Sequence, residues 1–410
     1  MHEITASTQA ILLLTSSFFE KKAEDVIPLN SIEWGRFALW LHEHNLKPDS
    51  LLQGDFENLL STWSDNNITK NRLKILLNRG ATLALAIEKW QRVGIWVVTR
   101  SSSDYPQQLK KKLRHLSPPV LYGIGNPRLL NKPAVAVVGS RKAPKKILEY
   151  AYKLGNKIAN DGYTLVSGGA KGIDEVAMMG ALEAGGTAIG ILPDNLLKAS
   201  LLSQYRHALM NNELVLISAY YPESPFSVTN ALENNKYIYT QSLSTIVAHS
   251  EIKGGTWSGA NEALKKEYTS VWVTLISEGN KKLAERGANI LPIGVFENTM
   301  NFLRDGNIGL KKSKKPLSLF DDFDEEKFSS KKTMLNVKED TDNNSKEVSF
   351  FNFFISKLYQ SYPKNSIFKQ KELEKKFSIK PSQINDWIAE AEEKQLIKRV
   401  KGRVKKYYIN

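Results

Sequence analysis

A glycine, a serine and an arginine stand together at Gly139-Ser140-Arg141, directly after the apolar run 134–138, and could bind a phosphate group. The glycine permits a tight turn at the end of a strand, the serine hydroxyl can donate a hydrogen bond, and the guanidinium offers two parallel donors to an anion. An ordinary strand–helix turn with a surface arginine has the same composition. Anion binding is the more specific chemistry that these residue types support.

A second glycine-rich turn follows the apolar run 163–166 and reads Ser167-Gly168-Gly169-Ala170-Lys171-Gly172-Ile173-Asp174. Three glycines in five positions allow a ligand to approach the backbone closely, the start of the next helix presents its amide groups, and Lys171 adds positive charge. The segment matches neither the GxGxxG dinucleotide motif nor the Walker loop. We expect Asp174 to cap the helix rather than to contact the ligand.

Two further polar helix openings have the same character. Gly254-Gly255-Thr256 follows the apolar run 245–248, and Asn235-Lys236 opens an amphipathic helix. One such opening alone is a weak signal, but several at one edge of a sheet indicate an anion site. The predicted phosphate-binding residues are Gly139, Ser140, Arg141, Ser167, Gly168, Gly169, Lys171, Asn235, Lys236, Gly254, Gly255 and Thr256. We predict no catalytic residue, no metal ligand and no cofactor.

Alternating apolar runs and helical stretches between residues 133 and 302 must position these turns. The apolar runs lie at 134–138, 163–166, 187–192, 213–218, 245–248 and 270–275. Strands that alternate with helices form a mainly parallel sheet with helices on both faces, and ligands bind at the carboxyl ends of its strands. The sequence therefore predicts an α/β protein with a Rossmann-like, doubly wound sheet.

The regions that flank this core differ from it in composition. Residues 1–90 show apolar residues at three- and four-residue spacing over short segments, which predicts an N-terminal all-α domain of helix–hairpin–helix or SAM-like type. The core, with its entry connector, is expected over 91–303. Residues 304–347 hold 10 basic and 10 acidic residues without any period, which is typical of a disordered linker.

Residues 348–410 form a strongly basic segment, with 14 Lys and Arg against 6 Asp and Glu. Helical patterns over 350–360, 368–377 and 382–394 precede a two-stranded ribbon, which predicts a winged-helix domain. The basic residues predicted to bind DNA from its wing are Lys398, Arg399, Lys401, Arg403, Lys405 and Lys406. They suit the phosphates of duplex DNA better than its bases, and a winged helix that binds a protein is the alternative.

The overall composition indicates the kind of ligand and the compartment of the chain, and it excludes some kinds of site. Its formal net charge is +14, as in proteins that bind nucleic acids, and it contains no cysteine. The absence of cysteine excludes disulfides and thiolate metal sites and favours a reducing compartment. No window approaches the ~20 apolar residues of a membrane span, and the first apolar run lacks the basic flank of a signal peptide. We expect a cytoplasmic protein without membrane contact.

Four segments resemble the DNA-processing protein DprA (Smf) family, namely VAVVGSR, LVSGGAKGID, NALENNKYIY and KGGTWSGANEAL. The resemblance extends upstream to VVTRSSSDYPQQL and PPVLYGIGN. It implies a Rossmann-like core that binds single-stranded DNA, forms homodimers and delivers DNA to a RecA-type recombinase in recombination and natural transformation, without catalysis. It also implies phosphate contacts from Ser140, Arg141, Ser167, Gly168, Lys171, Asn235 and Lys236.

The chain departs from the family pattern at two of these motifs. The family usually has Arg-Asn-Arg or Arg-Asn-Lys where this chain has Asn234-Asn235-Lys236, so one cation is missing. The family's Ala-Arg-Gly-Ile-Asp appears here with Lys171 in place of arginine, which keeps the charge but loses the bidentate geometry. Both changes bear on how strongly the chain binds phosphate.

Two other functions stay open on the same fold. A nucleotide-hydrolysing enzyme of the lysine-decarboxylase-like superfamily would use an arginine with a glutamate in a GGxGTxxE arrangement, whereas here Glu262 stands seven positions after Gly255. A nucleotide- or DNA-sensing component of an antiphage system would reuse the core together with Asn234, the charged linker and the winged helix. Release of ribose phosphate would favour the enzyme, and the neighbouring genes would discriminate the antiphage role.

Overall fold

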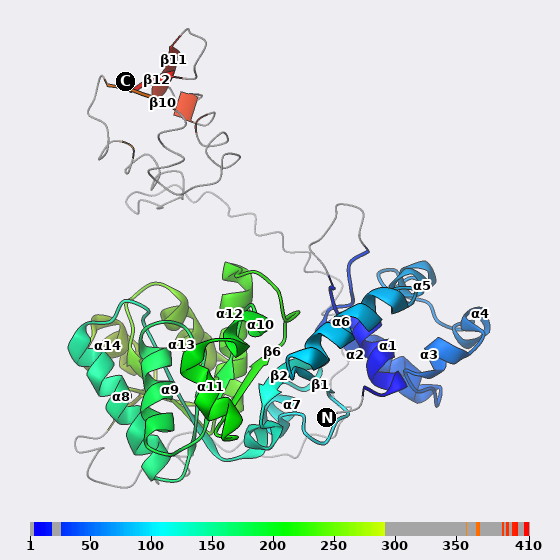
Figure 1. The fold of residues 1–410 in the computed structure, drawn as a ribbon, viewed down its shortest axis with the longest axis horizontal. Helices are drawn as coiled ribbons and strands as arrows, with labels where there is room; N and C mark the ends of the chain where they lie inside the picture. The colour runs from blue at the N-terminus through cyan, green and yellow to red at the C-terminus, as the bar shows by residue number, and fades with distance from the viewer. Residues whose placement is uncertain are drawn as a thin grey trace. The chain divides into compact units, whose positions relative to one another are not determined.

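The computed structural model describes residues 4–18, 26–291, 358, 366–369, 388, 391–392, 396–400 and 406–409 (Figure 1). The chain divides into two units, Met1–Ser313 and Lys314–Asn410. None of the helices in the described ranges has both the length and the apolar character that crossing a bilayer requires.

A nine-stranded sheet forms the centre of the first unit, in the order β1-β2-β6-β5-β4-β3-β7-β8-β9. Its strands are β1 (Trp96–Thr99), β2 (Val120–Gly125), β3 (Ala134–Gly139), β4 (Thr164–Ser167), β5 (Ala188–Ile191), β6 (Leu214–Ser218), β7 (Ser244–His249), β8 (Ser270–Val273) and β9 (Asn289–Ile290). The seven strands from β6 to β9 run parallel, and β2 runs antiparallel to both of its neighbours. The predicted mainly parallel sheet is therefore confirmed.

Both faces of the sheet are buried, and the central strand β3 is apolar from Ala134 to Val138. Along β3, Val135 and Val137 belong to one hydrophobic cluster, and Ala136 and Val138 belong to the other. The helices that pack on the first face include α8 (Lys145–Asn160), α9 (Ile173–Glu183), α10 (Leu196–Ser200) and α11 (Ser203–Met210). The second face is covered by α7 (Gln107–Leu113), α12 (Val228–Gln241), α13 (Gly255–Lys265) and α14 (Glu278–Glu285). Helices on both faces confirm the doubly wound architecture.

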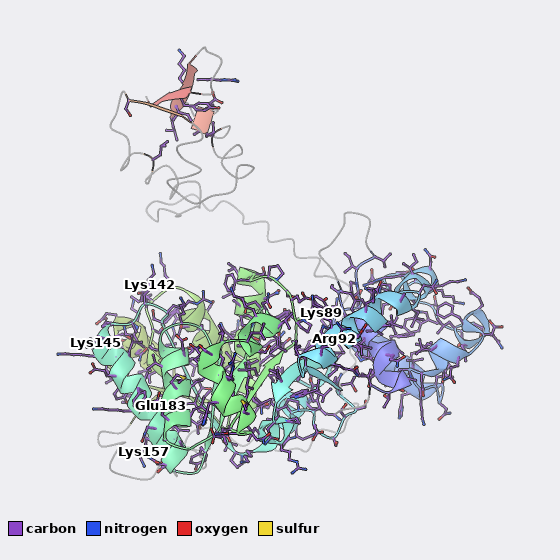
Figure 2. The ribbon with its side chains drawn as sticks, in the orientation of Figure 1. Lys89, Arg92, Lys142, Lys145, Lys157 and Glu183 are labelled. Carbon is purple, nitrogen blue, oxygen red and sulfur yellow. The ribbon has the colours of Figure 1, made fainter. Side chains whose placement is uncertain are left out.

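Short amphipathic helices precede the sheet, as their apolar spacing predicts. They are α1 (Ala6–Thr15), α2 (Ser31–Glu43), α3 (Ser50–Gln53), α4 (Phe56–Leu59), α5 (Lys70–Leu77) and α6 (Gly80–Arg92). Their buried side chains continue the hydrophobic cluster of the first sheet face. The Tyr122 hydroxyl of β2 donates to Ser16 Oγ at 2.7 Å, and Lys89 of α6 pairs with Glu223 at 2.6 Å (Figure 2). These contacts attach the helical region to the sheet.

In the second unit, β10 (Ile367–Lys369), β11 (Ile397–Val400) and β12 (Lys406–Ile409) form an antiparallel sheet in the order β10-β12-β11. The expected pairing of the last two strands is confirmed. Our expectation that a helix begins at Phe368 was wrong, because this residue pairs with Tyr407 across β10 and β12. The sequence pattern missed the long-range pairing that makes Phe368 part of a strand. The rest of the predicted helices and the linker lie outside the described residues.

The point where the strand order reverses shows at which edge of the sheet a ligand is expected to bind. The chain passes from β3 through β4 and β5 to β6 on one side, and then returns to place β7 on the other side of β3. The carboxyl ends of β3, β4, β5 and β7 therefore lie at the same edge of the sheet. Ligands of doubly wound sheets bind at such a switch point.

Candidate functional site

The glycine-rich turns after β3 and β4 lie in contact with each other. Gly172 has a φ of +98°, and a Cβ at this position would come within 2.9 Å of backbone atoms of Ser140 and Arg141. The backbone N–H of Ser140 donates to the carbonyl of His249 at 3.0 Å. Ser140 Oγ accepts from the N–H of Lys142 at 3.2 Å, so its hydroxyl hydrogen can still be donated to a ligand.

Asp174 joins the same two turns through its carboxylate. Oδ1 accepts the N–H of Gly139 at 3.2 Å, and Oδ2 accepts the N–H of Gly168 at 3.1 Å. Our expectation that Asp174 caps α9 was therefore wrong, because α9 begins after Gly172 and the carboxylate points back to the ends of β3 and β4. Burial raises the pKa of Asp174 to about 6, although both backbone hydrogen bonds lower it. The carboxylate fixes the two turns and occupies the amide donors of Gly139 and Gly168.

Ser167 is fully buried and also faces the sheet. Its hydroxyl donates to the carbonyl of Val137 at 2.6 Å. The side chain thus joins the end of β4 to β3, and the structure does not bring it to the surface where a ligand would bind.

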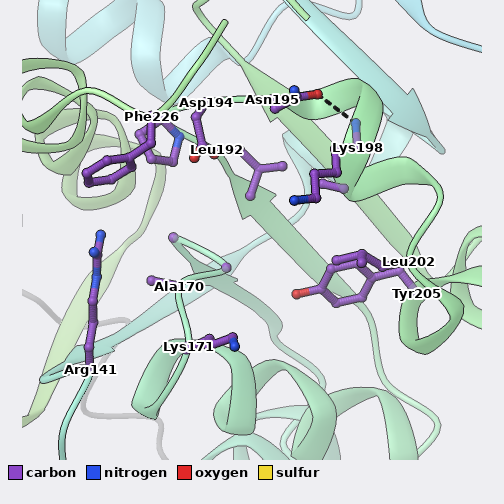
Figure 3. A pocket seen from close by; sticks show the side chains of 14 residues that line it. Arg141, Ala170, Lys171, Leu192, Asp194, Asn195, Lys198, Leu202, Tyr205 and Phe226 are labelled. Atoms are coloured by element: carbon purple, nitrogen blue, oxygen red, sulfur yellow. Dashed lines mark hydrogen bonds between the residues drawn. The ribbon is translucent and has the colours of Figure 1, made fainter. Parts of the chain in front are cut away.

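A pocket of about 360 Å³ opens at the carboxyl ends of β4 and β5, beside the turn after β3 (Figure 3). Four of the predicted phosphate-binding residues line it, namely Arg141, Gly168, Gly169 and Lys171. The other lining residues are Ala170, Leu192, Pro193, Asp194, Asn195, Lys198, Ala199, Leu202, Tyr205 and Phe226. In the close-up, Arg141 extends toward Phe226, and Lys198 and Tyr205 lie across the opening from them. The guanidinium carbon of Arg141 lies 5.2 Å from the ring centroid of Phe226.

The pocket carries an excess of positive charge. Arg141, Lys171 and Lys198 are all exposed, and in the part of the chain that the structure describes none of them forms an ion pair. Asp194 is the single carboxylate among the residues that line the pocket. Unpaired cations beside glycine-rich backbone suit a phosphate better than a neutral ligand.

Five of the predicted residues form a second group, in the middle of α12 and at the start of α13. Our expectation that Asn235 and Lys236 open a helix was wrong, because Ser227 caps α12 and the helix already begins at Val228. Asn235 Nδ2 donates to the carbonyl of Gly255 at 3.1 Å, which ties the two helices together. Lys236 pairs with Glu233 at 2.7 Å and lies 5.0 Å from the ring centroid of Tyr237. Gly254 and Gly255 are exposed, and Thr256 is half-buried. None of these predicted residues lines the pocket, so the structure separates the twelve predicted residues into two places.

Asn234, where the family usually has arginine, is buried in the core. Its Nδ2 donates to the carbonyl of Ile191 at 2.7 Å, and its side chain is 2% exposed. The asparagine therefore fixes α12 to the end of β5. It does not present a polar group to solvent at this edge of the sheet.

The predicted wing residues are described only in part. Lys398 and Arg399 lie on β11 and are exposed, and Lys406 lies on β12 opposite Val400. Lys401, Arg403 and Lys405 lie outside the described residues.

Sequence reasoning missed several pocket residues because they come from other segments of the chain. Asp194 and Lys198 follow β5, Tyr205 lies on α11, and Phe226 precedes α12. The Pro193-Asp194-Asn195 turn directly after the third parallel strand was the signal that could have revealed part of this group. Phe226 and Tyr205 left no comparable pattern.

Glu262, the residue closest to a hydrolase glutamate, accepts from Lys266 Nζ at 2.9 Å and from the Tyr268 hydroxyl at 3.0 Å, and it does not line the pocket. Within the described ranges, no group of three or more His, Asp or Glu side chains is placed to hold a metal ion.

The proteins that are similar to this chain include two sequence relatives and one solved structure. DNA processing protein DprA of Streptococcus pneumoniae is 28% identical over 43% of this chain and 65% of its own length, so the match covers just under two thirds of that protein. DNA processing protein DprA of Bacillus subtilis is 26% identical over 51% of this chain and 72% of its own length. The X-ray structure of the S. pneumoniae protein covers 72% of this chain and 97% of that chain, with a TM-score of 0.56 and 19% identity, which shows a shared fold.

The profile of one protein family matches residues 96–303, which is half of the chain and includes both glycine-rich turns, the pocket and the starts of α12 and α13. Together with the doubly wound sheet and the cationic pocket at its carboxyl edge, this match identifies the family. The chain belongs to the DNA recombination-mediator protein A family.

Proposed function

We propose that this chain binds single-stranded DNA through its backbone phosphates and acts as a recombination mediator. The observation that carries the proposal is the pocket at the carboxyl edge of the sheet, where Arg141, Lys171 and Lys198 are exposed beside two glycine-rich turns. Phosphates are the strongest ligands for such cations in nucleic acids. The names of the S. pneumoniae and B. subtilis relatives support DNA as the ligand.

A single strand suits this pocket better than a duplex. Unpaired bases can turn away from their neighbours, whereas the bases of a duplex are stacked inside the helix. The pocket offers apolar side chains, among them Phe226 and Leu202, beside the cations. A nucleotide of a single strand can place its phosphate on the cations and its base on the apolar side chains at the same time.

Further basic residues extend the positive surface beyond the pocket. Lys142 and Lys145 follow Arg141 in the chain and are exposed (Figure 2). They can contact the phosphates of neighbouring nucleotides. Because these contacts involve the backbone and not the base edges, most positions along the strand should show little sequence preference.

The proposal extends to the partners of the chain and to its division into domains. We propose that the core, 91–303, pairs with a second copy of itself and delivers the bound strand to a RecA-type recombinase in the cytoplasm. The winged-helix domain, 348–410, would contact duplex DNA, which the exposed Lys398 and Arg399 favour. The residues 1–90 would form the helical domain and 304–347 the linker.

Fluorescence anisotropy with a labelled single-stranded oligonucleotide tests the binding proposal. Arg141→Ala and Lys171→Ala should each weaken binding about tenfold, because each removes a charge-assisted phosphate contact worth about 1.5 kcal/mol. Lys74→Ala is the matched control, since Lys74 is an exposed lysine of the N-terminal helices that pairs with Glu57. The control should bind like the unmodified protein.

Two results would overturn the proposal. One is the absence of binding by the unmodified chain at low salt. The other is equal affinity for Arg141→Ala, Lys171→Ala and the control, which would place the DNA away from the pocket.

A further inference from the structure

A carboxylate is part of the lining of this cationic pocket. Asp194 lines it together with Arg141, Lys171 and Lys198, and it follows β5 in the turn before α10. A carboxylate repels a phosphate, so a pocket that served phosphate alone would be better without it. Its presence indicates that part of the pocket binds something other than phosphate.

Asp194 is half-buried and keeps its acceptor capacity. Among the residues that the structure describes, no side chain or backbone group donates a hydrogen bond to its oxygens, and none forms an ion pair with it at 4.0 Å or less. Burial raises its pKa above the ordinary value, although the charges of Arg141 and Lys198 oppose this shift. An aspartate in the field of two cations, without a hydrogen-bond donor among the described residues, is available to a ligand that donates.

The pocket also exposes apolar side chains that could contact the face of a flat ring. Phe226 is 49% exposed, Leu202 is 40% exposed, and both line the pocket with Leu192 and Ala170. Aromatic and apolar side chains on which bases stack are typical of sites for single-stranded nucleic acids. The volume of about 360 Å³ lies in the range of small-ligand pockets.

The bases differ in what they can donate to a carboxylate. Guanine alone presents two adjacent donors, its N1–H and its exocyclic amino group, which match the two oxygens of a carboxylate. Adenine and cytosine present an amino group beside a ring nitrogen that accepts. Thymine presents one N–H between two carbonyl oxygens, which a carboxylate repels.

We propose that the pocket accepts one unpaired nucleotide with its base inside, and that Asp194 makes guanine the preferred base at this position. The inference rests on the proposed binding of single-stranded DNA and deepens it. The phosphate would lie toward Arg141 and Lys171, and the base would lie among Asp194, Phe226 and Leu202. All other nucleotides of the bound strand would be held through their backbone and would not be selected.

Oligothymidines that carry a single substituted nucleotide at the centre test the inference in the full-length protein. The substituted base is guanine, hypoxanthine, adenine or cytosine, and affinity is measured by competition against labelled oligothymidine. The guanine oligomer should bind about tenfold more tightly than plain oligothymidine, as expected for one bidentate contact. Hypoxanthine lacks the amino group and keeps the N1–H, so its oligomer should lie between the two, with about a threefold gain.

Asp194→Ala distinguishes the preference of the carboxylate for guanine from its general repulsion of the DNA phosphates. The variant should lose the guanine preference and at the same time bind plain oligothymidine more tightly, because a negative charge has left the pocket. Glu285→Ala is the matched control, since Glu285 is exposed on α14 and its removal changes the net charge equally. The control should keep the preference.

Binding of the four deoxynucleoside monophosphates, measured by calorimetry, distinguishes the inference from the function on which it rests. If oligomers bind without any guanine preference, the inference is overturned and the proposed function stands. If the guanine monophosphate binds selectively and no oligomer binds, the pocket assignment stands and the function fails. If neither kind of ligand binds, both fail, and a preference that survives in Asp194→Ala overturns the role of Asp194.

Discussion

The buried carboxylate of Asp174 makes a quantitative prediction about stability and pH. Burial raises its pKa in the folded chain from 3.8 to about 6, and Arg141, Tyr205 and Tyr239 are the titratable groups that interact with it. A group whose folded pKa lies above its unfolded pKa stabilises the folded state at low pH, and this contribution is lost as the pH rises through the folded value. With a pKa of 3.8 in the unfolded chain and about 6 in the folded chain, the contribution of Asp174 to the free energy of unfolding increases by about 1.3 kcal/mol as the pH falls from 7 to 5.

Replacement by asparagine removes this titration and keeps the size of the side chain. In Asp174→Asn, one amide oxygen can still accept from Gly139 or Gly168, while the amide nitrogen faces the other N–H. The difference in unfolding free energy between the unmodified chain and the variant should therefore shift by about 1.3 kcal/mol in favour of the unmodified chain as the pH falls from 7 to 5.

Urea unfolding of both full-length proteins at pH 5, 6 and 7, followed by far-ultraviolet circular dichroism, measures this difference. Other carboxylates titrate equally in both proteins, so the comparison isolates Asp174. A difference that stays constant over this pH range would mean that the pKa of Asp174 is not raised on folding, because the carboxylate would then titrate alike in the folded and unfolded chains.

Three further predictions concern the surroundings of the pocket. Gly172→Ala should destabilise the core by at least about 1 kcal/mol and weaken single-strand binding, because the new Cβ meets the backbone of Ser140 and Arg141 at a positive φ. The control is Gly185→Ala, at φ +73° with no atom near the new Cβ. It should lower the midpoint of thermal unfolding and leave the DNA affinity unchanged. Lys236→Ala should change the single-strand affinity less than threefold in anisotropy, since its ammonium pairs with Glu233 outside the pocket; a tenfold loss would move the binding site to α12. Deletion of residues 348–410 should weaken duplex binding more than single-strand binding in mobility shifts, and an equal loss for both would argue against a duplex-binding wing.

The sequence predicted those parts of the site that lie in continuous segments. The turn at Gly139 and the glycines after Ser167 were found because each directly follows an apolar run, and the parallel sheet brings such turns to one edge. The direction of a side chain within a turn was harder to predict. Ser167 faces β3 and Asp174 bridges two strands because of the register of the sheet, which local sequence does not encode.

Residues that reach the pocket from distant segments could not be predicted from spacing. Asp194, Tyr205 and Phe226 meet there only because β5, α11 and the segment before α12 end at the same edge of the sheet. The separation of Asn235 and Lys236 from the pocket has the same origin, since the position of α12 depends on its packing against α13 and β5. Long-range packing therefore decides which of these polar segments line the same pocket.

The salt dependence of single-strand binding shows whether Arg141 and Lys171 hold the phosphates of the strand. Each phosphate contact with a cation contributes about 0.7 to the slope of the logarithm of affinity against the logarithm of salt concentration. The double variant Arg141→Ala/Lys171→Ala should reduce the magnitude of this slope by about 1.4 relative to the unmodified chain. An unchanged slope would contradict the account, because the phosphates of the strand would then not be held by the pocket.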